Sequence, residues 1–297
     1  MSSKTKTKKK FIKAKCSPKS LKNKNTTDTC LSNNNIFYLK KQWNKRNKMD
    51  ENRQIKSNDS REIWFELKKK LNNSCNSEIC MVRNLITDKN LLNDLLFEKF
   101  KPKMPDEWKN NPTEWLSSDE ISESMKQYEN AYSDFVFLGP SPIDYDFIED
   151  DNTCVWPEIC KFNLHKMIKK NKKKIGFIFN LDPHTKGGSH WVSMFLDIID
   201  KKLYYFDSAG SKIPKQLMKL VNNIQEQGKK INNNFIIEFE ESYPHEHQKK
   251  NTECGMYSLY FLINMLTEKK SWKFFKNDVV SDEEMQTYRE KYFNKVF

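Results

Sequence analysis

Apolar positions in the first part of the chain recur mainly at the three- and four-residue spacing of helices. Two segments, 62–67 and 91–97, follow this spacing, which predicts two amphipathic helices. A group of Ser and Asp residues at 117–120 predicts the start of a third helix that runs to about Tyr128, because such side chains cap the free N–H groups of a helix. The region before residue 130 is therefore predicted to be largely helical.

Farther along, the pattern changes to short apolar runs of strand length, separated by polar turns. The turn at 200–202 is short enough to join its two flanking runs as a hairpin. The predicted elements are strands at 174–181, 190–199 and 203–207, a helix at 214–230, a strand at 235–241 and a helix at 253–268. The last helix is apolar on all sides, so it must lie in the core. This order of elements predicts an α+β fold.

Composition divides the chain into three predicted parts. Residues 1–27 are mostly Lys, Asn, Ser and Thr, which predicts a disordered basic tail. Residues 28–100 have helical patterning and are predicted to form a helical arm domain. Pro102 and Pro105 then interrupt the pattern and mark a boundary. Residues 101–297 are predicted to form the main domain, which is long enough to bury a core of its own.

The net charge of +12 is concentrated at one end of the chain. Residues 1–50 contain 15 Lys and Arg against 2 Asp and Glu, a net of +13, so residues 51–297 sum to −1. A basic N-terminus can contact nucleic-acid phosphates without sequence preference. The balanced remainder has no charge that would attract it to nucleic acid. We therefore expect any nucleic-acid contact to involve the N-terminus.

Apolar content and cysteine usage indicate an intracellular protein with no membrane partner. No apolar run approaches the roughly 20 residues of a membrane span, and the first residues lack the apolar stretch of a secretory signal. The seven Cys are therefore expected to be thiols and not a disulfide framework. The pairs Cys75 with Cys80 and Cys154 with Cys160 are spaced more loosely than typical zinc ligands. We expect neither a metal nor a cofactor.

Two residues of the predicted main domain could together activate a thiol. Cys254 stands at the start of the apolar helix, where the partial positive charge and free N–H groups of a helix N-terminus favour a thiolate. His190 opens a predicted strand, and none of the other four His does so. An imidazole there could take the thiol proton. Considered alone, Cys254 also fits a small core residue, and His190 fits a structural histidine.

Two further residues could complete such a site. Asp207 ends the strand that is predicted to pair with the His190 strand. Neighbouring strands lie about 5 Å apart, so this carboxylate could reach Nδ1 of His190 and orient the ring. Alone, Asp207 could equally cap the following turn. Gln248, six residues before Cys254, could donate to a developing oxyanion, although a loop Gln is ordinarily solvated.

These residues, in this order, resemble the clan of cysteine proteases that contains adenain and the SUMO proteases. The likeness is greater to the polyprotein-processing proteases of African swine fever virus and related large DNA viruses. It is carried by Tyr205-Phe206-Asp207-Ser208-Ala209-Gly210, Thr252-Glu253-Cys254-Gly255 and Ser281-Asp282-Glu283-Glu284-Met285. The resemblance is strong over residues 174–297, moderate over 115–150 and weak over 28–100.

The resemblance implies a protease core of the adenain and SUMO-protease type, with an N-terminal helical arm. It also implies the role of each site residue. Cys254 would be the nucleophile, His190 the base, Asp207 its orienting partner and Gln248 the oxyanion donor. Asp207 matches the cellular members of the clan, whereas the viral members can carry Asn at this position.

The resemblance further implies that two Trp side chains bind substrate. Trp191 follows the base, as in the family, where an aromatic lid covers a narrow tunnel for Gly-Gly. Trp115 begins a segment that resembles the family pattern W-L-x-D, but here Asp119 follows one residue later. Both side chains could instead be core packing residues.

The activity that the resemblance implies is cysteine endopeptidase cleavage of viral structural polyproteins at Gly-Gly-X sites during virion maturation. The enzyme would act in the virion or the host cytoplasm, on a polypeptide substrate. Three alternatives stay open. The first is removal of ubiquitin or SUMO, and the second is acetyl transfer through the same thioester. The third is a non-enzymatic virion protein that binds nucleic acid through its basic end.

Overall fold

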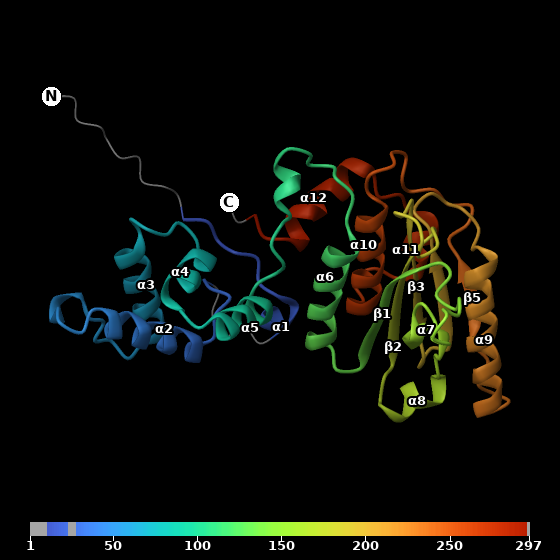
Figure 1. Ribbon diagram of the computed structural model, residues 1–297, viewed down its shortest axis with the longest axis horizontal. Coiled ribbons are helices and arrows are strands. Elements are labelled where there is room, and N and C mark those ends of the chain that lie inside the picture. Colours follow the sequence, from blue (N-terminus) through green and yellow to red (C-terminus); the bar gives the residue numbers. More distant parts are fainter. Residues whose placement is uncertain (1–10, 23–27, 296–297) are drawn as a thin grey trace. The chain divides into compact units, whose positions relative to one another are not determined.

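The structure is a computed structural model that describes residues 11–22 and 28–295. The chain forms two compact units (Figure 1). The unit called the arm comprises the described residues up to Met104 together with residues 292–295. The unit called the core comprises residues 105–291. The division falls four residues later than the predicted boundary. Residues 292–295, predicted to lie in the main domain, belong to the arm, where Asn294 pairs with Lys103 and Pro102.

The core unit is built on one five-stranded sheet with the strand order β1-β2-β3-β4-β5. The strands are β1 (Phe135–Pro142), β2 (Lys174–Asn180), β3 (Trp191–Asp197), β4 (Lys202–Phe206) and β5 (Glu238–Glu241). β2, β3 and β4 are antiparallel, which confirms the predicted hairpin, while β1 and β5 are parallel to their neighbours. The sequence pattern did not predict β1, because Gly139, Pro140 and Pro142 are residues that usually interrupt strands.

Helices cover both faces of this sheet. The core helices are η2 (Asp106–Lys109), α6 (Ser118–Ala131), α7 (Pro157–Cys160), α8 (Leu164–Lys169), α9 (Lys215–Ile231), α10 (Cys254–Thr267), α11 (Trp272–Asn277) and α12 (Asp282–Tyr292). On one face, Phe261 of α10 stacks on Phe206 of β4 with ring centroids 4.9 Å apart. On the other, Leu220 of α9 shares a buried cluster with Phe177 and Val192. This three-layer arrangement confirms the mixed α and β fold.

The arm unit contains only helices and isolated bridges among its described residues (Figure 1). Its helices are α1 (Pro18–Lys22), α2 (Asn33–Arg46), η1 (Glu51–Arg53), α3 (Ser60–Leu71), α4 (Glu78–Leu85) and α5 (Lys89–Lys99). Ser32, Asp59, Ser77 and Asp88 cap the N-termini of the four longer helices, which explains where those helices start. The helices predicted near 62–67 and 91–97 correspond to α3 and α5. Among the described residues, no helix is both long and apolar enough to cross a bilayer.

The prediction that residues 1–27 form a disordered tail is wrong for residues 11–22. Ile12 forms a bridge with Ser77, and Cys16 forms one with Phe100, so this segment packs into the arm. Residues 1–10 and 23–27 lie outside the described part of the chain. A polar, Lys-rich composition predicts weak intrinsic order, but it does not show the tertiary partners that hold residues 11–22 in place.

The expectation that all Cys are thiols is also wrong. Disulfides join Cys16 to Cys30, Cys75 to Cys80 and Cys154 to Cys160. Of the seven Cys, all of which lie in described residues, Cys254 alone is free. The paired Cα atoms are 5.1, 5.4 and 6.3 Å apart, within the range that a disulfide spans. The sequence could not predict these pairs, because they depend on distances that the tertiary fold sets.

Candidate active site

His190 and Asp207 meet at the open end of the β3–β4 hairpin. His190 directly precedes β3, and Asp207 directly follows β4. Nε2 of His190 lies 2.7 Å from Oδ1 of Asp207. The strand pairing therefore brings together the two residues expected to meet, but the expectation that Asp207 reaches Nδ1 is wrong. Strand spacing predicts which side chains approach one another, and the rotation of the imidazole ring decides which nitrogen makes the contact.

Asp207 is held rigidly in a buried position. Its side chain is 1% exposed. The backbone N–H of Ala209 donates to Oδ1 at 2.8 Å, and the backbone N–H of Asp207 donates to Oγ of Ser242 at 3.1 Å. A carboxylate with these partners can fix the orientation of His190 and stabilise a positive charge on its ring.

Cys254 is the first residue of α10 and is 2% exposed. Its side chain lies near enough to His190 to affect the pKa of the imidazole. Because Nε2 contacts Asp207, Nδ1 is the ring nitrogen that remains for the thiol. Burial lowers the pKa of His190, but hydrogen bonds and charges from Asp207 and Cys254 outweigh burial and raise this pKa to about 10. The imidazole is therefore positively charged at neutral pH, next to a sulfur at a helix N-terminus. This arrangement favours a nucleophilic thiolate.

Gln248 is buried, and its side chain is oriented by Ser208. The Ser208 hydroxyl donates to Oε1 of Gln248 at 2.7 Å, and the Ser208 carbonyl accepts the backbone N–H of Gln248 at 2.8 Å. Because Oε1 is occupied as an acceptor, the amide nitrogen is the end that can donate to an oxyanion. Sequence reasoning missed Ser208, whose place directly after Asp207 was the available signal.

Trp115 and Trp191 line the same cavity, which has a volume of about 700 Å³. Trp191 is 9% exposed and donates from Nε1 to the carbonyl of Leu116 at 3.0 Å, whereas Trp115 is 38% exposed. Gly187 and Gly188 line the cavity as well. Gly188 has a φ of +95°, and a Cβ there would lie 2.5 Å from the Asn180 amide, so only glycine fits.

Among the residues that the structure describes, no group of three or more His, Cys, Asp or Glu side chains is placed to hold a metal ion. The loosely spaced pairs Cys75 with Cys80 and Cys154 with Cys160 are used in disulfides. The site residues instead provide a thiol, an imidazole, a carboxylate and an amide. Together these groups define the class of cysteine hydrolases.

Comparisons with known proteins place the chain within this class. A model of the Ulp1 protease family, C-terminal catalytic domain, matches residues 160–297. A putative thiol protease of Acanthamoeba polyphaga mimivirus is 32% identical over 244 residues, which cover 80% of this chain and 76% of that protein. A protein named SUMO-1 cysteine protease, from African swine fever virus, is 28% identical over 247 residues, which cover 78% and 88%.

A crystal structure of the African swine fever virus protease has the same fold. It matches with a TM-score of 0.68 and 23% sequence identity, covering 95% of this chain and 96% of that one. The chain belongs to the Ulp1 protease family. It is a cysteine protease, as the resemblance in its sequence implied.

Proposed function

We propose that the protein is an endopeptidase that processes polyproteins at Gly-Gly-X sites, with Cys254 as its nucleophile. His190 acts as the acid and base, Asp207 orients it, and Gln248 donates to the oxyanion. The observation that carries these roles is that His190 contacts the buried carboxylate of Asp207 at 2.7 Å, while Cys254, the free cysteine, helps to raise the pKa of the same imidazole.

In the first half of the reaction, Sγ of Cys254 forms a bond to the scissile carbonyl carbon. The carbonyl π electrons move to oxygen, and Gln248 and the Cys254 backbone N–H donate hydrogen bonds to that oxyanion. His190 enters this step protonated, because its pKa is raised to about 10. It donates the proton to the leaving amine as the C–N bond breaks, which leaves a thioester on Cys254.

In the second half, His190 is neutral and accepts a proton from water. The water oxygen attacks the thioester carbon, and the oxyanion again forms opposite Gln248. Collapse of this intermediate breaks the C–S bond, releases the carboxylic acid product and restores the ion pair of Cys254 with His190. Asp207 stabilises the positive charge on the His190 ring before the reaction begins and again after the product is released.

Close packing next to the nucleophile supports a preference for glycine in the substrate. A Cβ at Gly255 would lie 3.0 Å from Leu116 and 3.2 Å from Trp191, so the cavity wall lies directly against the start of α10. A Gly-Gly segment passes such a wall without steric conflict, and this is the basis for the proposed Gly-Gly-X specificity.

Removal of SUMO or ubiquitin is the second candidate function. Its support is that a relative 28% identical to this chain is named a SUMO-1 cysteine protease. Cleavage after a Gly-Gly terminus would require the same close passage of two glycines past Trp115 and Trp191. The two candidates differ in the size of the partner, because a folded modifier contacts much more surface than a peptide.

The test compares the wild-type enzyme with Cys254→Ala on a fluorogenic Gly-Gly-X peptide and on dye conjugates of SUMO and ubiquitin. Polyprotein processing predicts efficient cleavage of the peptide that is lost in the variant. Cleavage of the conjugates alone would contradict the proposal and assign deconjugation. Thioester formation with acetyl transfer to an added amine, without hydrolysis, would assign acetyl transfer.

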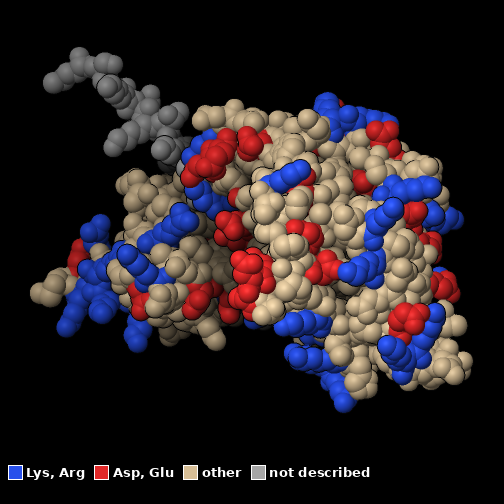
Figure 2. All heavy atoms as spheres, turned by 45° about the vertical axis from the view of Figure 1, so that its right-hand side comes forward, with Lys and Arg blue, Asp and Glu red and all other residues tan. Residues whose placement is uncertain are grey.

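We further propose that the basic end of the chain contacts nucleic acid. Residues 1–104 and 292–297 carry a net charge of +17 and residues 105–291 one of −5, which together give the +12 of the chain. Figure 2 shows Lys and Arg side chains on the surface of the arm, and others on the core. Binding to a random-sequence DNA duplex should weaken steeply between 50 and 200 mM salt, as for other basic proteins. Removal of residues 1–10 should reduce that salt dependence, and salt-independent binding would contradict the proposal.

Within the same proposal, the enzyme works in the virion or the host cytoplasm, where structural polyproteins are available. Quantitative mass spectrometry of gradient-purified particles tests this location. Recovery of the protease in constant proportion to the capsid proteins supports it. Absence from both the particles and the cytoplasmic fraction would contradict it.

A further inference from the structure

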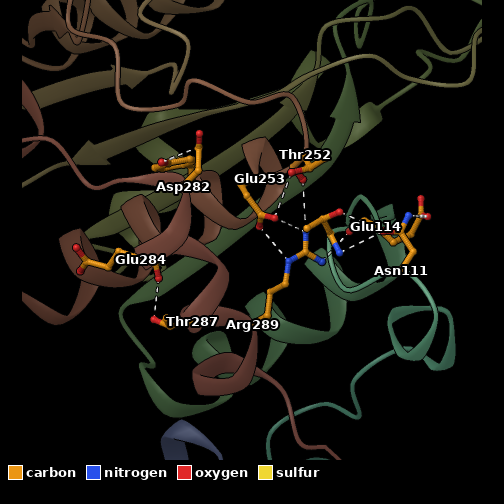
Figure 3. A network of polar contacts seen from close by, with 10 residues as sticks. Asn111, Glu114, Thr252, Glu253, Asp282, Glu284, Thr287 and Arg289 are labelled. Carbon is orange, nitrogen blue, oxygen red and sulfur yellow. Dashed lines mark hydrogen bonds and ion pairs between the residues drawn. The ribbon is translucent and has the colours of Figure 1, made fainter.

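Arg289 of α12 is bound to the residue that precedes Cys254 (Figure 3). Its Nε and Nη2 donate to the two carboxylate oxygens of Glu253 at 2.9 and 3.1 Å, and Nη2 also faces the Thr252 carbonyl at 3.4 Å. Both charged side chains are almost wholly buried, with 4% and 0% exposure. This two-pronged ion pair therefore holds the chain immediately before the nucleophile.

Glu253 occupies the N-cap position of α10 but does not cap the helix with its side chain. Its carboxylate turns toward Arg289 instead. Burial raises the pKa of Glu253, and the hydrogen bonds and charge of Arg289 oppose that rise. The guanidinium thereby balances a negative charge that would otherwise stand one residue from the thiolate. A like charge at that position disfavours an anionic nucleophile.

The same guanidinium also holds the cavity wall. Nη1 of Arg289 donates to the Glu114 carbonyl at 2.6 Å, on the opposite side of the guanidinium from Glu253 in Figure 3. Trp191 donates to the Leu116 carbonyl at 3.0 Å. The two carbonyls that flank Trp115 are therefore fixed by side chains from different elements. The first donor, Arg289, is also bound to Glu253, the residue before Cys254. The second donor, Trp191, directly follows His190.

We propose that Arg289 is a positioning residue that holds the Trp115 side of the cavity wall at a fixed position relative to the Cys254 nucleophile. The proposal rests on the role proposed above for Cys254. The guanidinium is suited to this position because it donates in several directions within one plane, and it also lies 4.3 Å from the Trp108 ring centroid. A lysine ammonium would keep the charge but could not bind both Glu253 oxygens and the Glu114 carbonyl.

The experiment compares Arg289→Gln and Arg289→Lys with the wild-type enzyme. Lys219→Gln is the matched control, since it removes one positive charge from an exposed ion pair with Asp146. Three quantities are measured for each: kcat and KM on the Gly-Gly-X peptide, the rate of Cys254 alkylation by iodoacetamide, and the melting temperature. Alkylation needs no occupied cleft, and Cys254 is the free cysteine. It therefore reports on the nucleophile alone.

Arg289→Gln should lower kcat/KM by about 10²-fold and slow alkylation by about 10-fold, because it removes both the charge balance and the wall contact. Arg289→Lys should keep alkylation within about 3-fold of wild type but raise KM by about 10-fold, because the charge remains and the wall contact is lost. Lys219→Gln should change none of these quantities by more than about 2-fold.

Two results would overturn the inference. In the first, both variants melt at lower temperature but keep wild-type kcat, KM and alkylation rate per folded molecule, so that Arg289 is only structural. In the second, Arg289→Lys behaves as wild type throughout, so that charge alone matters. If Arg289→Gln does not fold, Arg289→Lys decides between these results. If the wild-type enzyme cuts no Gly-Gly-X peptide, the proposed specificity fails, and the alkylation rates alone decide the role of Arg289.

Discussion

The arm unit and the core unit differ in the interactions that hold each of them in shape. In the arm, Cys16 is bonded to Cys30 and Cys75 to Cys80, and Asn294 bonds the backbone of Lys15 and Lys101. In the core, the candidate site depends on the hydrogen bonds of His190 with Asp207 and of Ser208 with Gln248, together with the free thiol of Cys254 at the start of α10. Loss of these two disulfides should therefore affect mainly the stability of the arm, whereas the third disulfide, Cys154 with Cys160, lies in the core. Changes of single polar groups at the candidate site should affect catalysis.

The strongest test on the core side is Cys254→Ala. Turnover should fall by at least about 10⁴-fold, since no other group in the proposed site can form the thioester. The melting temperature should stay within a few degrees, because the change removes one buried sulfur atom. Peptide hydrolysis and circular dichroism measure the two effects. Activity equal to that of the wild type would refute the assignment of the nucleophile.

The second test is Asp207→Asn, which should lower kcat by roughly 10²–10⁴-fold. The pKa of His190 is raised to about 10, so the protonated ring is present below that value and activity should fall as pH rises through it. Without the carboxylate, this pKa moves down, and the alkaline limb of kcat/KM moves to lower pH. A pH–rate profile from pH 6 to 11 measures the shift. An unmoved alkaline limb would show that Asp207 does not set the charge of His190.

The same raised pKa predicts a pH-dependent term in stability. A group whose pKa is higher in the folded state stabilises the fold fully below its unfolded value of 6.5. That stabilisation decreases as pH rises toward about 10 and is lost above it. Urea unfolding of wild type and His190→Gln at pH 6 and pH 10.5 measures this contribution. The two proteins should differ more at pH 6, and an equal difference at both pH values would contradict the expectation.

A smaller effect is expected for Gln248→Ala. Removal of one oxyanion donor typically lowers kcat by about 10²–10³-fold, while the Cys254 backbone N–H still donates. KM should change little, because the hydrogen bond strengthens only as the oxyanion forms. Steady-state kinetics separate these quantities. Ser208→Ala should lower kcat less than Gln248→Ala does, because it leaves the amide in place and removes only the hydroxyl that orients it.

On the arm side, Cys16→Ser with Cys30→Ser should lower the free energy of unfolding by about 3 kcal/mol, because the disulfide closes a loop of 14 residues. Cys75→Ser with Cys80→Ser is the matched variant. It opens a loop of 5 residues and should cost about 1 kcal/mol less. Cleavage of a short peptide by the core should stay within about 2-fold for both variants. Equal losses of stability would contradict the loop-entropy account, and a large loss of cleavage would show that the arm supports catalysis.

Several parts of the site could be predicted because each has a local signal. His190 follows a Gly pair and directly precedes a strand, Asp207 directly follows the next strand, and Cys254 starts an apolar helix. Ser208 had only a weak signal, its place directly after Asp207, and Arg289 had none. A Ser after an Asp is common in turns, and Arg289 lies 35 residues beyond Cys254 on a polar helix. Their roles depend on contacts that no local pattern encodes.

Local propensity and periodicity determined the strands of the hairpin, the capped helices and the apolar helix that begins with Cys254. These features depend on residues close together in the chain, so the sequence alone carries them. The tertiary structure decided the rest. It determined which His190 nitrogen faces Asp207, which Cys form disulfides, and that Arg289 lies between Glu253 and Glu114. Each of these requires distances of a few ångströms between residues far apart in sequence, and only the packed fold sets such distances.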